Sequence, residues 1–188
     1  MLLLYCIVSY CTSTLYRKET IIIEPKAVKT FQCADCNTVC TDTDLFTIDD
    51  RQICHKCLFG EEPPVRIYPI GIVHNDLKRD NTPFGRKGTS TISTIELFPS
   101  QKQFMYGLDQ EPEITIVYYL HKSRSVKTLF NRGLDGKRVG VFASRSPDRL
   151  SRIGIQNVTL MEIRGTRLTV KGLDAISGTP VLDIKLKI

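Results

Sequence analysis

Short apolar runs separated by turn signals fill the chain from residue 66 to its end, and they restrict the fold more than any other feature. Seven of these runs have the length and the Val, Ile, Thr and aromatic content of β-strands. They lie at residues 67–74, 90–98, 114–122, 138–144, 155–164, 166–173 and 180–187. Helical spacing occurs at residues 99–108 and 123–130. We therefore predict a mainly β domain over residues 66–188 with one or two short helices, built as a barrel or a sandwich.

Four cysteines near the start of the chain predict a separate small module. They form two C-x2-C pairs, Cys33 with Cys36 and Cys54 with Cys57, with 17 residues between the pairs. This spacing lies in the range of four-cysteine zinc sites, in which each pair places two thiolates on one side of a tight turn. The intervening residues suffice for a hairpin but not for a core, so bound metal would supply much of the folding energy. We predict a zinc-ribbon-like module over residues 31–60.

Alternatives to this ligand set remain open. Cys40 and His55 are spare donors, and Cys40 is the first substitute ligand to consider. A disulfide pair or a redox dithiol is a further alternative, although disulfides are uncommon in the cytosol. A site of four thiolates has no open coordination position, so we expect its zinc to be structural and not catalytic.

The chain begins with an apolar stretch that resembles a signal peptide only in part. It lacks basic residues ahead of the apolar run and a small-residue cleavage site after it. A run of about 11 residues is also shorter than the roughly 20 that a bilayer requires. We therefore expect residues 1–30 to be an N-terminal extension and expect no membrane partner, with a weak membrane-associating segment as the alternative. The Pro-paired stretch at residues 60–64 predicts a linker.

Basic residues are concentrated in the β-rich part of the chain. The first 64 residues carry 6 basic and 9 acidic side chains, whereas the remaining residues carry 20 and 11. Three arginines lie in the loop that follows the strand-like run near residue 140: Arg145, Arg149 and Arg152. Such a loop could grip an anion, and the basic excess suits a polyanionic partner such as RNA. An ordinary solvated loop is the alternative.

Residues 140–154, together with residues 173–174 and 178–185, resemble the TsaA/TrmO-like family. The family pattern reads roughly GVFATRSPHRPNPIG, followed by LDLLDGTPVLDIKPY. This chain keeps Gly-Val-Phe-Ala, Arg-Ser-Pro, the second Arg, Ile-Gly and nearly the whole GTPVLDIK run. Residues 68–74 and 118–122 also resemble family strands, so the likeness covers about residues 66–188. It favours the barrel over the sandwich.

The resemblance implies an S-adenosylmethionine-dependent methyltransferase of the β-barrel type, and the absence of a Gly-x-Gly-x-x-Gly motif after a strand disfavours a Rossmann-type enzyme. Characterised members methylate threonylcarbamoyladenosine beside the tRNA anticodon. The resemblance also implies a cytoplasmic homodimer with the cofactor site near the subunit interface. The implied cofactor contacts are Pro83, Phe84, Gly85, His121, Lys122, Arg145, Ile155, Ser177, Gly178, Thr179 and Pro180. Arg145 would bind the methionine carboxylate, since a guanidinium can form a bidentate pair.

Methyl transfer from a sulfonium is an in-line displacement, so alignment matters most and the neutral thioether leaves without an acid. His121 or Asp183 could accept the proton that an amine nucleophile loses. The alternatives are a half-buried strand histidine for His121 and pairing with Lys185 or Arg145 for Asp183. The expected contacts to the anticodon loop are Arg149, Arg152, Arg124 and Lys127.

The chain departs from the family pattern in three places, one of which is residues 82–85, where the family often has Pro-Arg-Gln. Asp148 stands where the family has His, residues 150–152 replace Pro-Asn-Pro, and Ser177 replaces Asp. Two other functions therefore stay open beside tRNA methylation. One is a non-catalytic protein that pairs a zinc ribbon with a barrel for a nucleotide-like ligand, and the other is methyl transfer to a small metabolite.

Overall fold

The structure is a computed structural model that describes residues 29–41, 45–77, 90–123 and 125–187. Its largest part is a closed barrel with the strand order β10-β11-β6-β5-β12-β7, in which every neighbouring pair is antiparallel. The strands are β5 (Gly71–His74), β6 (Ile92–Leu97), β7 (Glu113–Tyr119), β10 (Ile153–Arg164), β11 (Arg167–Lys171) and β12 (Pro180–Leu186). The predicted mainly β fold is confirmed, and closure leaves this sheet without free edges.

The barrel interior is filled by apolar side chains that alternate along the strands. β7 shows this most clearly, because Ile114, Ile116 and Tyr118 are buried while their neighbours are less so. The whole buried cluster is Val73, Ile95, Leu97, Ile114, Ile116, Tyr118, Val158, Leu168, Val170, Leu173, Ala175 and Val181. Full burial of such a side chain contributes about 1.5–3 kcal/mol, so this core accounts for the stability of the barrel.

Two short 3-10 helices, η3 (Pro99–Phe104) and η4 (Leu108–Gln110), connect β6 to β7. They confirm the helical prediction for residues 99–108. The helix predicted at residues 123–130 is wrong, because the described residues of this segment form no helix. Its backbone groups bond to neighbouring segments of the fold, and its last residues form β8 (Leu129–Asn131).

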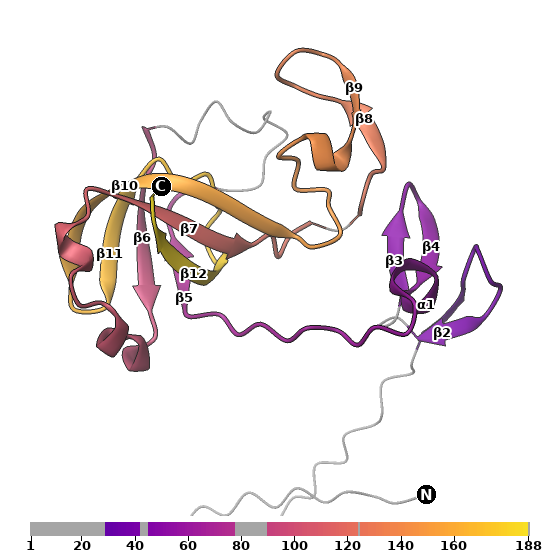
Figure 1. Ribbon diagram of the computed structural model, residues 1–188, viewed down its shortest axis with the longest axis horizontal. Coiled ribbons are helices and arrows are strands. Elements are labelled where there is room, and N and C mark those ends of the chain that lie inside the picture. The colour runs from indigo at the N-terminus through magenta and orange to yellow at the C-terminus, as the bar shows by residue number, and fades with distance from the viewer. Residues whose placement is uncertain (1–28, 42–44, 78–89, 124, 188) are drawn as a thin grey trace, which may run out of the picture.

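One predicted barrel strand, at residues 138–144, is also wrong. Only β9 (Arg138–Gly140) is a strand, and it pairs with β8 outside the barrel. The chain then turns into the 3-10 helix η5 (Val141–Ala143). We call β8, β9 and η5 the arm, and Figure 1 shows it standing away from the barrel sheet. The loop that follows, residues 144–152, is the cationic loop.

The cysteine module comprises four short strands and one helix. They are β1 (Thr30–Gln32), β2 (Val39–Thr41), β3 (Leu45–Ile48), β4 (Arg51–Cys54) and α1 (His55–Phe59). β3 and β4 form a hairpin whose two turn residues, Asp49 and Asp50, have φ of 43° and 66°. Positive φ at both positions is characteristic of a two-residue type I′ turn.

An extended linker joins the module to the barrel (Figure 1), with no regular element between α1 and β5. This agrees with the predicted linker at residues 60–64, and the predicted strand at 67–74 begins only at Gly71. Within the described part of the chain, no helix is long and apolar enough to cross a membrane. Almost all of the predicted extension at residues 1–30 lies outside the described residues.

Candidate functional site

The four predicted metal ligands, Cys33, Cys36, Cys54 and Cys57, come together in the module. Their sulfur atoms all lie within 4.8 Å of one another. The Sγ atoms of Cys33 and Cys57 are 3.9 Å apart, and those of Cys36 and Cys54 are 3.7 Å apart. Tetrahedral zinc with bonds of about 2.3 Å requires sulfur atoms about 3.8 Å apart. The arrangement therefore fits a zinc ion.

The two cysteine pairs reach this cluster in different ways. After Cys36 the chain makes a tight turn in which Asn37 has φ of 59° and donates its N–H to the Cys33 carbonyl at 2.9 Å. The second pair does not lie in a tight turn of this kind, because Cys54 is the last residue of β4 and Cys57 lies in α1. The spare donors stay outside the cluster: the Cys40 thiol contacts the Thr38 carbonyl, and the His55 ring packs near Phe59.

Backbone groups prepare the Cys33 thiol to lose its proton. Hydrogen bonds from the main chain of Cys36 and then of Cys54 lower the pKa of Cys33 to about 6. The Cys54 N–H lies 3.3 Å from the Cys33 sulfur. The pKa of Cys36 is also lowered, chiefly by the Thr38 hydroxyl, whereas hydrogen bonds with Cys54 and Cys36 raise the pKa of Cys57. Two of the four thiols are thus biased toward the thiolate form that binds metal.

A second group of predicted residues meets where β7 ends and β12 begins. His121 follows β7, and its Nδ1 lies 3.4 Å from Thr179 Oγ1. Thr179 is only 2% exposed, and Gly178 has φ of 83°, a left-handed conformation that favours glycine. Val73 of β5 holds the turn by accepting from the Gly178 N–H at 2.8 Å and donating to the Thr179 carbonyl at 2.9 Å.

The imidazole of His121 is set to be neutral. Burial, and then the positive charge of Lys122, lower its pKa from the ordinary value of 6.5. A neutral imidazole has one donor and one acceptor nitrogen, so it can receive a proton at neutral pH.

Tyr118 links this end of the barrel to the cationic loop. A Cβ atom on Gly154 would lie 2.4 Å from a Tyr118 ring carbon, so only glycine allows β10 to pass the ring. Burial, and then the negative charge of Asp174, raise the pKa of Tyr118 to about 12, while the charge of Arg145 acts in the opposite direction. Arg145 itself is exposed.

Arg149 organises the cationic loop from within. Its Nε donates to the Ser146 carbonyl at 2.8 Å and its Nη2 donates to the Ser144 carbonyl at 2.7 Å. Two other basic residues predicted to bind RNA are joined to their surroundings through backbone hydrogen bonds. Arg152 has φ of 50° and accepts from the Leu120 N–H at 2.7 Å, and the Lys127 N–H donates to the Asp148 carbonyl at 3.2 Å.

The remaining predicted residues are dispersed. Ile155 is 58% exposed on the outside of β10. Asp183 forms an ion pair of 2.7 Å with Lys185 and lies opposite Val117, so the structure does not bring it to His121. Lys122 and Ser177 are exposed, and Pro180 begins β12. Pro83, Phe84, Gly85 and Arg124 lie outside the described residues.

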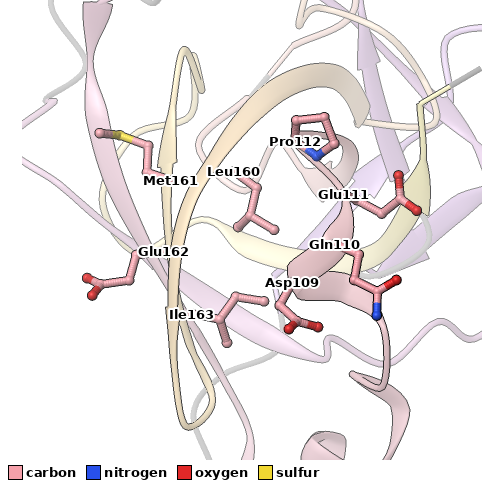
Figure 2. A pocket seen from close by; sticks show the side chains of 8 residues that line it. All are labelled: Asp109, Gln110, Glu111, Pro112, Leu160, Met161, Glu162 and Ile163. Carbon is pink, nitrogen blue, oxygen red and sulfur yellow. The ribbon is translucent and has the colours of Figure 1, made fainter.

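A shallow hollow lies at the other end of β7 and β10 (Figure 2). Its lining residues are Asp109, Gln110, Glu111, Pro112, Leu160, Met161, Glu162 and Ile163. Three of these side chains are acidic, and none belongs to the predicted cofactor set. The hollow is therefore separate from the His121 end of the barrel.

Sequence reasoning did not single out Tyr118 or Gly154 for a contact with each other. The only available signal was that Gly154 ends the Ile-Gly part of the loop pattern. Their pairing across β7 and β10 is a property of strand register, which that pattern alone does not specify.

These features define a small closed β-barrel, and comparisons with known proteins show the family to which it belongs. The model of a family described as "tRNA-methyltransferase O N-terminal domain" matches residues 58–187. The chain therefore belongs to this family of S-adenosylmethionine-dependent methyltransferases.

Named relatives agree with this assignment. The chain is 39% identical over 123 residues to a probable S-adenosyl-L-methionine-binding protein of Methanothermobacter thermautotrophicus, a match that covers 64% of this chain and 88% of the relative. It is 37% identical over 93 residues to the tRNA (adenine(37)-N6)-methyltransferase of Homo sapiens, covering 47% of this chain and 21% of the human protein.

A solved structure shows the same fold. The crystal structure of TrmO from Pseudomonas aeruginosa superposes with a TM-score of 0.54 and 26% identity, covering 67% of this chain and 57% of the other. The chain thus spans only part of the human and Pseudomonas proteins.

Proposed function

We propose that this protein transfers a methyl group from S-adenosylmethionine to threonylcarbamoyladenosine beside the tRNA anticodon. One observation carries the proposal: the Gly178-Thr179 turn, part of the family motif, is held against a neutral His121 at one end of the barrel. The name of the human relative specifies N6 of adenine 37 as its methylated atom, which is consistent with this acceptor.

S-adenosylmethionine, when bound, supplies an activated methyl group on a sulfonium. The residues of this chain would hold the cofactor and align the acceptor. Arg145 would pair with the methionine carboxylate, and the backbone of the turn would face the adenine edge. The His121 Nε2 atom lies on the side of Gly178, at 3.9 Å from where a Cβ would be, so imidazole and turn border the same space. The other proposed contacts are Pro83, Phe84, Gly85, Lys122, Ile155, Ser177 and Pro180.

His121 is the better of the two proposed proton acceptors. Its neutral imidazole can take the proton that the acceptor nitrogen loses. The Asp183 carboxylate instead forms an ion pair with Lys185 and accepts a hydrogen bond from the Ile184 N–H at 2.9 Å. Asp183 would therefore contribute less to turnover than His121.

The cationic loop is proposed to hold the anticodon stem-loop. Lys127 is exposed and Arg152 is half-buried, so their charges could hold phosphates while a base enters the site. Arg124 is proposed to add to this surface. Arg149 would contribute mainly by keeping the loop in shape, since two of its donors bond to loop carbonyls.

The cysteine module is proposed to bind one structural zinc ion through Cys33, Cys36, Cys54 and Cys57. The sulfur distances and the lowered pKa of Cys33 support this assignment. We further propose a cytoplasmic homodimer with the cofactor site near the subunit interface. The exposed apolar side chain of Ile155, which the family resemblance assigns to the cofactor site, is consistent with such an interface.

Two measurements test the proposal. Calorimetry should detect binding of S-adenosylmethionine, and a labelled methyl group should enter tRNA that carries threonylcarbamoyladenosine but not tRNA that lacks it. Cofactor binding without transfer to any tRNA would favour a small metabolite as acceptor. Absence of cofactor binding would favour the non-catalytic alternative.

A further inference from the structure

The turn of the module's β3–β4 hairpin makes a specific contact with the segment that leads into the arm. Asp49 Oδ1 accepts from the Thr128 N–H at 3.0 Å, and the Thr128 hydroxyl donates to Asp49 Oδ2. The two residues are 79 positions apart in the sequence. A carboxylate that binds a backbone N–H and a hydroxyl of the same residue fixes that residue in one orientation.

Main-chain bonds reinforce this contact. The Val126 N–H donates to the Thr47 carbonyl at 2.9 Å, and the Asp49 N–H donates to the Val126 carbonyl at 2.9 Å. Ile48 and Val126 form a parallel β-bridge, and Val126 is only 5% exposed. In Figure 1 the hairpin lies beside the base of the arm. The contact thus combines a strand-like bridge, a buried apolar side chain and a charged pair of hydrogen bonds.

The same short segment supports the cationic loop from its other side. The Lys127 N–H donates to the Asp148 carbonyl at 3.2 Å, and the Thr128 carbonyl accepts from the Val141 N–H at 3.1 Å. Ser123 Oγ donates to the Pro147 carbonyl at 3.0 Å. Residues 126–128 therefore lie between the module and the loop, bonded to both.

We propose that Asp49 is a positioning residue through which the cysteine module sets the conformation of the cationic loop. Metal held by the four cysteines would fix the hairpin. Asp49 would then fix Thr128, and the segment at 126–128 would order Lys127 and residues 141–148 through its hydrogen bonds. The expected effect on tRNA binding rests on the proposed function. The structural coupling between the module and the loop is independent of that function.

The contact can be removed by substitutions that preserve shape. Thr128→Val deletes the hydroxyl but keeps a β-branched side chain, whereas Thr128→Ser keeps the hydroxyl. Asp49→Asn removes the charge, and Asp50→Asn in the same turn is its matched control, since both residues have positive φ and asparagine tolerates that conformation.

Amide hydrogen exchange of the metal-loaded full chain is the direct test. In Thr128→Val and Asp49→Asn, exchange at the amides of Val126, Thr128 and Lys127 should rise about tenfold, as expected for losing a hydrogen bond to a charged group. Thr128→Ser and Asp50→Asn should behave like the unchanged protein, and barrel amides such as that of Ile116 should stay protected in all variants. Unchanged exchange at Lys127 in Asp49→Asn would overturn the proposal.

Removing the metal with a chelator should have the same effect on the unchanged chain. Protection at Lys127 and Val141 should fall together with that of the hairpin, and it should fall less in Asp49→Asn, where the link is already weakened. If the hairpin loses protection and Lys127 does not, the module and the loop are independent and the proposal fails.

Binding measurements separate this proposal from the proposed function. The tRNA dissociation constant should rise about fivefold to tenfold in Thr128→Val and recover in Thr128→Ser. If the unchanged protein binds no tRNA, the proposed function is wrong, while the exchange data still decide whether Asp49 positions the loop. If the protein binds tRNA and Thr128→Val does not weaken it, Asp49 has no positioning role toward RNA.

Discussion

The barrel and the cysteine module are stabilised in opposite ways. Twelve buried side chains fill the barrel, whose sheet closes on itself. Among the described residues of the module, only Cys33, Ile53 and Cys54 are buried, and its strands are three or four residues long. Such a small core rarely sustains a fold without metal or disulfides. The barrel should therefore fold from its own sequence, whereas the module should depend on a metal ion held by its four cysteines.

Chelation should produce the largest difference between the two regions. With the metal removed under reducing conditions, the module should lose its structure, because ligand binding and folding are one step in such sites. Thermal unfolding of the barrel should be nearly unchanged. Metal analysis of protein purified without chelator should find one zinc per chain, and a metal-free but fully ordered module would contradict this view.

Gly154→Ala should damage the barrel and leave the module intact. The added methyl group would meet the Tyr118 ring at 2.4 Å, and overpacking of this kind costs about 1–3 kcal/mol or more. Gly133→Ala is the matched control, since a Cβ there has no neighbour within 4 Å. Denaturant unfolding measures both variants, and equal stability of the two would show that the ring moves aside freely.

Arg145→Ala should weaken S-adenosylmethionine binding by about 1.5–3 kcal/mol, because it removes a charge-assisted hydrogen bond. Calorimetry measures the change, with Arg138→Ala on β9 as the control. An unaltered dissociation constant in a folded Arg145→Ala protein would assign Arg145 to RNA or to the fold.

Arg152→Gln should have a smaller effect, confined to RNA. Loss of one phosphate contact should weaken binding similarly for all tRNA sequences and reduce the salt slope by somewhat less than one unit. Arg164→Gln, at the other end of β10, is the control because its side chain pairs with Glu162. If both substitutions leave the salt slope unaltered, the tRNA interpretation of the cationic loop is wrong.

The smallest expected effect is on the titration of His121. Its pKa in the folded protein lies below 6.5, so the unfolded chain binds the proton more tightly. This histidine therefore costs stability only as pH falls below 6.5 and has no effect above it. NMR titration should show a midpoint below 6.5, and Lys122→Gln should move the midpoint upward. A midpoint at or above 6.5 would refute the neutral imidazole.

The comparison also separates what the sequence could predict from what it could not. The alternation of apolar residues and the turn signals predict the six barrel strands, because burial of one face of a strand leaves this pattern in the strand's own sequence. Residues 123–130 and 138–144 were misassigned because their conformation depends on partners. Val126 bonds to the module, and β9 has only β8 beside it.

The candidate site divides in the same way. Cysteine spacing predicted the sulfur cluster, since four ligands at such spacing have few other uses. The family motif predicted the residues at the His121 end, but the separation of Asp183 from His121 follows from the register of β12 on β7. The contact between Asp49 and Thr128 has no local signal at all, because neither residue type is unusual in a turn or a loop.

The linker makes the contact between the module and residues 126–128 intramolecular, so its strength depends on an effective concentration set by the tether. A short tether keeps the hairpin near residues 126–128 at an effective concentration in the millimolar range. A contact too weak to join two separate molecules at cellular concentrations would then be closed most of the time within one chain. If the contact opens, the tether keeps the module near the arm, so the contact can form again within the same chain while the barrel stays folded.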